Sequence, residues 1–507
     1  MDKFYRFSFS SLQKLLFLLM LHWIYSVLWQ MQVLSGLWGL VGLAFILLLY
    51  LVFPKAFQRV FDFLMKYKGL ILLFMFVFQL ALLFSSQLMI RRDAAVVFRG
   101  AFFLSEAQSI SNYLTRNPNN LALFLYERFF YQVFGDGGLW VLQGLNTFYV
   151  YLTTYILYKG GQVLYGQKLA DRVFAFFVLL MGFSPYFMAM YTDVFILPLV
   201  ALQLVLAIAL FKDKDRGIYW LPLFSLGLVS ALAMLFRPPT LILLMAFMLV
   251  YVLRKKWKQG LLTILLLSLS FAGPYYLLKK GLDHQDQVQL LEGKGLAKGP
   301  LLFINLGLTY TGTNQSDMKK GLLAYLPEEE RDNYNNGMFA QENVKKEIVR
   351  RLKDYTPKTF LDHLEYKERW SVMDGTLDWI YFSDVSKEKT AFVSPLYESL
   401  KGPVTQWIRQ HFISYDHPDY RLWAIFKQVI WVMVSLGMLM ALLRFYPEDD
   451  RRNVLILALF GALLFLTIFE GGKTRYLIQF LPQILFLSAL GWEDATAFLE
   501  RRKRSER

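Results

Sequence analysis

The sequence predicts an all-α polytopic membrane protein with about twelve transmembrane helices, interfacial helices in a first large outer loop, and a small, mostly helical extracytoplasmic domain. Two observations support this prediction. Hydrophobic residues make up 56% of the 507 residues and aromatic residues 17%, more than a soluble protein of average composition contains. The basic residues, which give a net charge of +15, fall mostly in short loops between apolar runs, where they set orientation and contact anionic lipid.

The composition also excludes several classes of function. No basic stripe with interleaved exposed aromatic residues is evident, so a nucleic-acid partner is not expected. The absence of cysteine excludes disulfides, thiolate metal sites and a cysteine nucleophile. None of the five histidines has zinc-ligand spacing, so the sequence predicts no protein-ligated metal site.

The first two apolar runs, residues 15–34 and 36–53, predict a pair of spanning helices with the N-terminus in the cytoplasm. The first run is long, lacks a small-residue cleavage site and is followed at once by the second, so it is not a cleaved signal peptide. A basic loop comes next. The positive-inside rule then directs the third run, residues 69–90, to exit on the outer face, where Arg92 and Asp93 follow.

Residues 120–134 form the ambiguous element, because their pattern is helical but Glu127 and Arg128 stand in the middle. A span needs about 20 residues with few charges. We therefore expect an amphipathic helix in the outer interface, which makes residues 91–138 one long outer loop. With this assignment every later basic cluster lies on the cytoplasmic side of the membrane. If residues 120–134 spanned the membrane instead, most of these clusters would lie on the outer side.

The remaining spans are predicted at residues 139–158, 173–190, 194–211, 218–236, 240–253, 261–278, 422–443, 454–469 and 476–491. Between them lies a polar segment of roughly 140 residues, which is large enough for a small outer domain. The predicted organisation is a transmembrane region at 1–278 with its catalytic outer loop, an extracytoplasmic domain at 279–420, and C-terminal helices with a basic cytoplasmic tail at 421–507. Both termini are then cytoplasmic.

Helix signals recur inside the outer domain. Thr356-Pro357 and Ser394-Pro395 are pairs of a capping residue and a first-turn proline. Apolar residues at helical spacing between residues 339 and 352 indicate a further helix. Asp374-Gly375-Thr376 with the following Asp378 and Trp379 is read first as an ordinary turn, and second as a polar loop with an aromatic platform for a sugar.

Charged residues gather at the outer ends of the predicted spans. They are Arg91, Arg92, Asp93, Arg99, Asp193, Arg237, Glu470, Lys473 and Arg475. Interfacial anchoring and helix capping explain the first three equally well, and Lys and Arg snorkel at helix ends as a matter of course. Loop solvation does not, however, explain why acidic and basic residues occur together on the predicted outer side, opposite the cytoplasmic side where most basic residues are expected.

These residue types suit a phosphate-linked substrate at the outer interface. Asp93 can act as a general base toward an acceptor hydroxyl. Arg237, Lys473 and Arg475 can neutralise a phosphate, because Arg offers a planar fork and Lys a point charge. A sugar linked to a lipid phosphate matches these features.

The chain resembles the GT-C glycosyltransferases. The resemblance rests on an acid in the first large outer loop, a Pro-Asn-Asn stretch ending at Asn120, a Tyr-Thr-Asp turn ending at Asp193, and a late turn from Glu470 to Tyr476. That group includes the protein O-mannosyltransferases and the lipid A aminoarabinose transferase, and the similarity is greatest to integral membrane glycosyltransferases of Gram-positive bacteria. It covers residues 69–271 and 421–491.

The resemblance implies that Asp93 is the catalytic base and that Lys473 and Arg475 contact the carrier phosphate. Two helices precede the family's usual first helix and have no assigned role. The first-loop motif lacks an Asp-Glu pair, so the resemblance does not imply a metal ion that bridges the donor and the acid. No cofactor is expected with certainty, and a divalent Mg or Mn ion is left open. Asp193 either supplies a second carboxylate or holds Arg237, with equal weight.

The function that follows is inverting transfer of a sugar from a polyprenyl phosphate, expected to be undecaprenyl phosphate, to a cell-wall or surface glycopolymer outside the cell. The expected substrate-binding residues are Arg92, Asp193, Arg237, Glu470, Lys473, Arg475 and Tyr476. A transporter or flippase for lipid-linked sugars is the first alternative; it would place ionisable residues in mid-membrane and show paired broken helices. A non-catalytic envelope assembly protein is the second alternative, in which Asp93 is unimportant.

Overall fold

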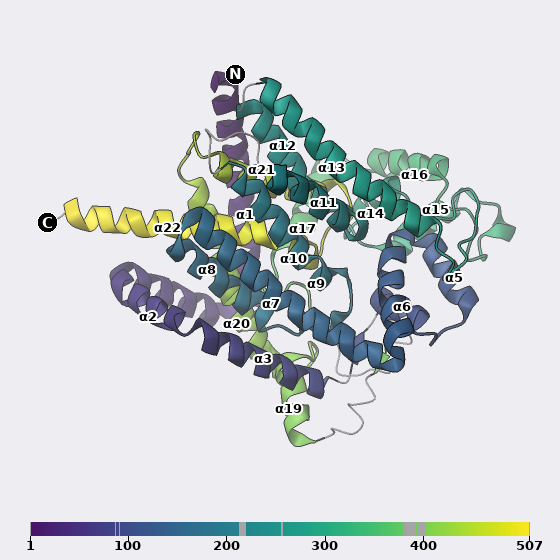
Figure 1. The fold of residues 1–507 in the computed structure, drawn as a ribbon, viewed down its shortest axis with the longest axis horizontal. Coiled ribbons are helices and arrows are strands. Elements are labelled where there is room, and N and C mark those ends of the chain that lie inside the picture. The colour runs from purple at the N-terminus through teal and green to yellow at the C-terminus, as the bar shows by residue number, and fades with distance from the viewer. Residues whose placement is uncertain are drawn as a thin grey trace.

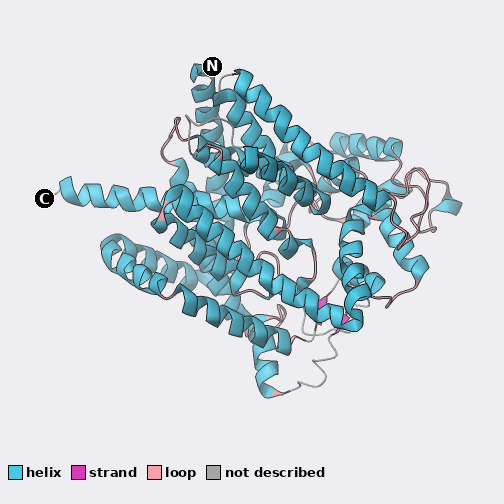
Figure 2. Ribbon diagram, viewed as in Figure 1, coloured by secondary structure: helices cyan, strands magenta, loops and turns pink. Residues whose placement is uncertain are grey.

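A computed structural model describes residues 2–86, 88–90, 92–211, 220–254, 257–379, 381, 392–393 and 402–505 of the protein. The described chain is helical apart from turns and one antiparallel pair of short strands, β1 (Leu88–Ile90) and β2 (Phe392–Val393). Figure 2 shows helices throughout, with the strands as two small magenta segments. The predicted all-α class is confirmed.

Among the described residues, six helices are long and apolar enough to cross a membrane. They are Lys3–Val52, Lys68–Ser85, Thr192–Ala209, Lys258–Asp283, Tyr420–Leu442 and Asp450–Ile468. Two shorter apolar helices, Trp220–Phe236 and Pro238–Arg254, coincide with further predicted spans. The polytopic class is therefore confirmed, and only the predicted spans 139–158, 173–190 and 476–491 have no counterpart in this set.

The first helix, α1 (Asp2–Val52), consists of two helical segments joined at Gly36, whose φ of 65° and ψ of −165° lie outside the helical region. Glycine adopts this conformation without the steric cost of a Cβ. The join falls between the first two predicted spans. The first segment packs along α20 (Tyr420–Leu442), and Gln13 Nε2 donates a hydrogen bond to the Leu442 carbonyl (2.7 Å).

Two boundaries near the third span differ from the prediction. The expected basic loop is a helix, α2 (Pro54–Lys66), because Pro54 fits the first helical turn and apolar residues recur on one face. The third span ends before residue 90, since α3 (Lys68–Ser85) gives way to β1, which pairs with β2 from the outer domain.

Three helices follow in the segment that was predicted to be an outer loop. They are α4 (Arg92–Ala101), α5 (Ala107–Arg116) and α6 (Leu121–Phe134). The predicted helix α6 is present, but its charged pair does not face solvent: Glu127 is 1% exposed and Arg128 3%. Arg128 Nη2 donates to the Gly100 carbonyl (2.8 Å), and burial raises the pKa of Glu127 well above its ordinary value. The hydrogen bond from Arg128 therefore connects α6 to the end of α4.

The next helices form the first half of the bundle. They are α7 (Gly138–Tyr165), α8 (Gln167–Phe177), α9 (Thr192–Phe195), α10 (Leu197–Ala209), α11 (Trp220–Phe236), α12 (Leu241–Arg254) and α13 (Trp257–Asp283). The predicted span 173–190 is interrupted by a π-helical turn, Val178–Gly182. Lys427 Nζ donates to the carbonyls of Leu179 (2.5 Å) and Leu180 (3.0 Å) in this turn, which places an ionisable group inside the bundle.

The segment 279–420 is mostly helical where it is described. Its helices are α14 (Pro300–Gly307), α15 (Gln315–Leu323), α16 (Gln341–Asp354), α17 (Pro357–Val372) and α19 (Pro403–Phe412). Thr356 caps α17 through a capping box, at the predicted helix start. The second predicted start, at Ser394-Pro395, lies outside the described residues.

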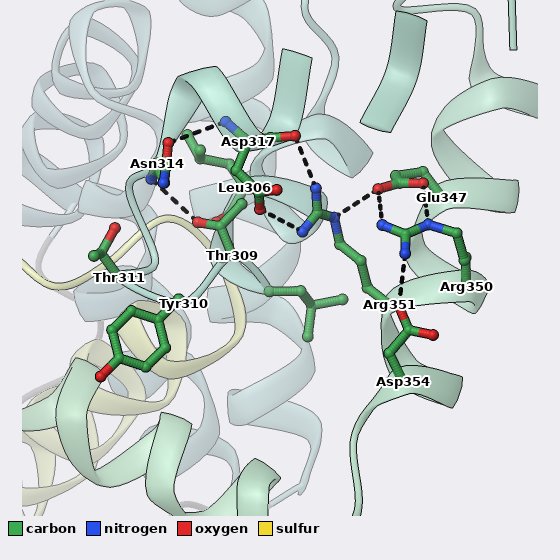
Figure 3. Close-up of polar contacts among 12 residues, drawn as sticks. Leu306, Thr309, Tyr310, Thr311, Asn314, Asp317, Glu347, Arg350, Arg351 and Asp354 are labelled. Carbon is green, nitrogen blue, oxygen red and sulfur yellow. Dashed lines mark hydrogen bonds and ion pairs between the residues drawn. The ribbon is translucent and has the colours of Figure 1, made fainter. Parts of the chain in front are cut away.

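A polar network holds α15 and α16 together (Figure 3). Arg351 forms ion pairs with Asp317 (2.7 Å) on α15 and with Glu347 (2.9 Å) on α16. Asn314 Oδ1 accepts a hydrogen bond from the Asp317 amide (3.0 Å) and so caps α15. Glu347 is fully buried and also pairs with Arg350 (2.6 Å), so its charge is compensated.

The chain ends with α20, α21 (Asp450–Ile468), a 3-10 helix (Thr474–Phe480) and α22 (Leu481–Ser505). The last predicted span thus begins as a 3-10 helix. In Figure 1 the C-terminal end of α22 projects on one side of the molecule, and α5, α15 and α16 lie on the opposite side.

Candidate active site

Segments that are distant in the sequence meet at one cavity of about 260 Å³. Its lining includes five of the residues predicted for the site, namely Arg92, Asp93, Asp193, Lys473 and Arg475. The other three predicted residues, Arg237, Glu470 and Tyr476, are not part of the lining but lie directly behind it, as their contacts below show. Arg91 lies outside the described residues, and the side chain of Arg99 instead donates to the Leu104 carbonyl (3.2 Å).

Asp93 stands in the first turn of α4, and its side chain is exposed at the cavity. A carboxylate is favoured there because the first turn of a helix has free N–H groups and a positive dipole end. Arg92 adopts a φ of 55°, which is uncommon for a residue with a Cβ, so the chain turns sharply as it enters α4. The helix start therefore presents Asp93 to the cavity.

A hydrogen-bonded series leads from Asp93 to the opposite wall. Tyr113 lies beside the Asp93 side chain, Asn120 Nδ2 donates to Tyr113 Oη (2.8 Å), and Tyr191 Oη donates to Asn120 Oδ1 (3.2 Å). Asn120 thus directs its N–H to Tyr113 and its oxygen to Tyr191. The hydroxyl proton of Tyr113 is then available to the carboxylate, which can only accept when it is ionised. The Pro-Asn-Asn stretch thus orients the expected base.

Asp193 is 3% exposed and is held by two arginines. Arg237 Nη2 lies 2.5 Å from Asp193 Oδ1 and its Nε donates to Thr192 Oγ1 (2.7 Å), while Arg475 Nε lies 3.9 Å from Asp193 Oδ2. Of the two roles that the sequence left open, Asp193 fulfils the holding of Arg237, and it also lines the cavity. Compensation by two cations explains how a carboxylate is buried here.

The late turn is shaped by a glycine and a carboxylate. Gly472 has a φ of 76°, and a Cβ there would lie 2.4 Å from the Thr311 carbonyl oxygen of the outer domain. Tyr476 Oη donates to Glu470 Oε1 (2.5 Å) across the turn. Lys473 makes no hydrogen bond or ion pair with the described residues, and burial lowers the pKa of its ammonium group. A free ammonium group at the cavity is suited to an anionic ligand.

A buried lysine outside the cavity anchors this turn. Lys367 is 1% exposed, and its Nζ donates to the carbonyls of Gly307 (3.1 Å), Thr467 (2.8 Å) and Phe469 (2.5 Å). These carbonyls end α14 and α21, where a cation is favoured by the negative dipole end of each helix. The lysine therefore joins α14 and α17 of segment 279–420 to the start of the late turn.

The Asp374-Gly375-Thr376 segment is a turn, as first expected, but it also forms a wall of the cavity. The Asp374 carboxylate accepts from the amides of Thr376 (2.8 Å) and Asp378 (3.0 Å). Leu377 and Asp378 have φ values of 57° and 60°, a left-handed conformation that costs free energy for residues with a Cβ. Tyr186 Oη donates to the Leu377 carbonyl and helps to hold it.

Gln428 on α20 supports the same turn from the bundle. Its Oε1 accepts from the Gly375 amide (2.8 Å), and its Nε2 donates to the carbonyls of Met373 (2.8 Å) and Val27 (2.8 Å). Val27 belongs to α1, so one buried amide ties the N-terminal helix, α20 and the turn together. This contact gives the N-terminal helices a structural connection to the cavity.

Asp378 itself was not among the predicted site residues. Burial raises its pKa to about 6, and the nearby Asp374 adds to this shift, although Arg475 and Lys473 oppose it. Trp379 is 2% exposed, stacks on Tyr381 with ring centroids 4.0 Å apart, and donates its Nε1–H to the Ile413 carbonyl (2.9 Å). The aromatic pair is thus a rigid support beside Asp378.

Sequence reasoning assigned no role to four uncharged polar residues of the lining, Tyr186, Tyr191, Gln315 and Tyr381. Gln315 opens α15, and the network in Figure 3 positions that helix. Because these side chains carry no charge, a search for charged groups at the ends of the apolar runs did not mark them, although Tyr191 belongs to the Tyr-Thr-Asp turn. Within the described residues, no group of three or more His, Asp or Glu side chains is arranged to hold a metal ion.

Comparison with known proteins gives the following similarities. A family model described as "conserved hypothetical integral membrane protein" matches residues 17–496. No curated protein matches the sequence. The crystal structure of ArnT from Cupriavidus metallidurans in the apo state has a TM-score of 0.30 and 12% identity, over 86% of this chain and 78% of that one. The structure of that protein bound to undecaprenyl phosphate has a TM-score of 0.31 and 11% identity, over 84% and 78%. At these values the likeness assigns neither residues nor activity to this chain.

Proposed function

We propose that this chain, which belongs to the family of conserved hypothetical integral membrane proteins, transfers a sugar from a polyprenyl-phosphate carrier to an acceptor outside the cytoplasm. One observation carries the proposal: an exposed carboxylate, Asp93, and three cations, Arg92, Lys473 and Arg475, converge on one cavity from opposite ends of the chain. An acid beside an anion-binding cluster is what transfer from a sugar phosphodiester requires. Undecaprenyl phosphate as the carrier rests on the sequence resemblance to GT-C glycosyltransferases.

The cationic side of the cavity receives the carrier phosphate. Lys473 supplies a point charge that no described residue engages in a hydrogen bond or ion pair, and Arg475 supplies a guanidinium group that Asp193 holds in place. Arg237 keeps Asp193 fixed, and the Glu470–Tyr476 hydrogen bond keeps the shape of the late turn. These residues therefore bind or support the phosphate, as the sequence predicts.

The reaction is a single displacement. Asp93 removes the proton from an acceptor hydroxyl, and the oxygen attacks the anomeric carbon as the bond from that carbon to the phosphate oxygen breaks. The electron pair of that bond leaves with the carrier, so the phosphate gains one negative charge, which Lys473, Arg475 and Arg92 stabilise. One displacement inverts the anomeric configuration, and Tyr113 keeps Asp93 oriented throughout.

The site is proposed to face outward, with both termini in the cytoplasm. Arg254 pairs with Glu448 (2.5 Å) and Asp450 (2.6 Å), and Arg6 pairs with the same Glu448 (2.7 Å). This charged cluster joins the N-terminal end of α1 to the loop before α21 and contains none of the cavity residues. By the positive-inside rule this basic end is cytoplasmic, which leaves the cavity at the outer surface. The acceptor is then an envelope glycopolymer.

A flippase for lipid-linked sugars is the second candidate, because the structure contains features that the sequence had not indicated. Lys427 is an ionisable residue inside α20, and the π turn breaks the regular helix beside it. Its ammonium group is, however, engaged by two carbonyls rather than open to a path. The cavity with a free carboxylate therefore favours the transferase.

The test is transfer of labelled sugar from a polyprenyl-phosphate donor to envelope polymers by the full-length protein in liposomes. Asp93→Asn is expected to lower transfer by at least about 100-fold, since it removes the base. The matched control is Asp136→Asn, which alters an exposed carboxylate of the same outer loop outside the cavity. Equal transfer by both variants would remove Asp93 from the mechanism. Movement of the labelled lipid across the bilayer without transfer would favour the flippase.

A further inference from the structure

Asp378 is an unexplained acid in the cavity. Its carboxylate makes no hydrogen bond or ion pair with the described residues, although the side chain is half-buried and lines the cavity with Lys473 and Arg475. A partly desolvated carboxylate without a partner is unfavourable. It would also repel a phosphate bound by the same cations. We therefore expect the Asp378 carboxylate to bind a part of the ligand other than the phosphate.

The protein holds this carboxylate in a fixed and strained conformation. Asp378 and the preceding Leu377 are both left-handed, and Asp374 and Tyr186 fix their backbone from two sides. Such strain persists only where the surroundings impose it, and it gathers at binding sites. The stacked Trp379 gives the turn a rigid apolar support. The carboxylate is thus positioned before any ligand arrives.

The donor lipid and the released carrier lipid differ in charge and in hydrogen-bonding groups. The donor carries a phosphodiester with one negative charge and a sugar rich in hydroxyl donors, whereas the released carrier has lost the sugar and gained negative charge. Ionised carboxylates accept hydrogen bonds from hydroxyl groups and repel additional anionic charge. A free carboxylate beside Lys473 therefore discriminates between these two lipids.

We propose that Asp378 forms a sugar subsite: it accepts hydrogen bonds from hydroxyl groups of the donor sugar and disfavours the bare carrier phosphate once the sugar has left. This inference rests on the proposed function, since it assigns the sugar end of the same cavity. Gln315 on α15 lines the cavity with an amide that can make further hydroxyl contacts. The subsite selects the loaded carrier and promotes release of the product.

The experiment measures binding of two probes to the full-length protein in nanodiscs, polyprenyl phosphate and its sugar-linked form. Asp378→Asn is expected to weaken binding of the sugar-linked probe by about tenfold, because a charged acceptor is lost. The same variant is expected to bind bare polyprenyl phosphate a few-fold more tightly. In transfer assays, inhibition by the bare carrier should increase accordingly.

The comparison variants separate the possible outcomes. Asp374→Asn removes the acceptor that holds the turn, so it is expected to weaken binding of the sugar-linked probe without tightening that of the bare carrier. If Asp378→Asn weakens binding of both probes equally, the residue only supports the fold. If it tightens binding of both probes equally, the residue acts only through its charge. Either result overturns the subsite. Failure of the wild type to bind either probe would instead contradict the proposed function.

Discussion

Tyr113 lies beside Asp93, and Asn120 fixes its hydroxyl group by donating a hydrogen bond to it (2.8 Å). A general base must be held within hydrogen-bond reach of the hydroxyl that it deprotonates. We expect Tyr113→Phe to fold normally and to lower kcat/KM for sugar transfer by about tenfold, because Asp93 loses the neighbouring hydroxyl group that orients it.

The measurement is the rate of sugar transfer together with the melting temperature of each variant. Tyr155→Phe is the matched control, because Tyr155 is exposed on α7 and lies away from the cavity. A loss of transfer in Tyr113→Phe that is accompanied by an equivalent loss of stability would mean that the hydroxyl group only supports packing.

Asp378 makes the charge of the cavity depend on pH. Its pKa of about 6 is above the ordinary value of 3.8 because of burial, so it gains a proton as the pH falls through about 6. The cavity then loses a negative charge beside Lys473 and Arg475, and phosphate binding strengthens. We expect affinity for a polyprenyl phosphodiester without a sugar, whose single charge does not titrate in this range, to rise between pH 7 and pH 5.

Equilibrium binding at several pH values tests this expectation. Asp378→Asn should bind the same phosphodiester with an affinity that hardly changes over the range. An equal pH dependence in that variant would assign the titration to another group.

Residues of the site were predictable from sequence only where they carry charge at the end of an apolar run. Asp93, Asp193, Lys473 and Arg475 satisfy that rule, and they line one cavity. Asp378 does not, since it lies within the polar outer domain, where charges are common. Its significance depends on left-handed backbone and on missing partners, which are properties of the fold rather than of the local sequence.

At the scale of elements, Lys367 on α17 links the ends of two helices. Three carbonyls of α14 and of the end of α21 receive its ammonium protons. Lys367→Met leaves these carbonyls without their donor, at a cost of about 3 kcal/mol in the free energy of unfolding. The late turn with Lys473 begins directly after this contact, so phosphate binding should weaken as well.

Thermal or denaturant unfolding in detergent measures the loss of stability. The control is Lys353→Met, which removes an exposed lysine of α16 and is expected to change stability by less than about 0.5 kcal/mol. A stable Lys367→Met variant would indicate that water replaces the ammonium group at the helix ends.

Helix existence was more predictable than helix regularity. The apolar runs correctly predicted most of the apolar helices, and the Thr356-Pro357 pair correctly predicted the start of α17. The break after α8 was not predictable, because Val178–Gly182 is as apolar as a regular span and the carbonyls of this turn are bonded by Lys427 of the distant helix α20. The burial of Glu127 and Arg128 on α6 was not predictable for a similar reason, because it depends on the packing of neighbouring helices such as α4.

At the scale of the whole molecule, the first helical segment of α1 acquires a role that the sequence did not supply. His22 lies between Glu365 (3.3 Å) and Glu368 (2.8 Å) of α17, and the Val27 carbonyl accepts from Gln428. This segment therefore contacts both the helix that leads into the Asp374 turn and the glutamine that holds the turn. It supports the cavity wall through these two contacts.

Two buried glutamines at the contact between α1 and α20 allow this support to be tested. Gln13 bonds to the Leu442 carbonyl, far along α20 from the turn, and Gln428 bonds to Val27, Met373 and Gly375. Gln13→Leu leaves one buried carbonyl unpaired and is expected to lower the free energy of unfolding by about 1 kcal/mol, whereas Gln428→Leu leaves three backbone groups unpaired and is expected to lower it by about 3 kcal/mol. Only Gln428→Leu releases the turn that carries Asp378, so only this variant should also lose about tenfold in affinity for the sugar-linked carrier. Equal losses of affinity in the two variants, measured where both remain folded, would mean that α1 stabilises the bundle as a whole and not the cavity wall.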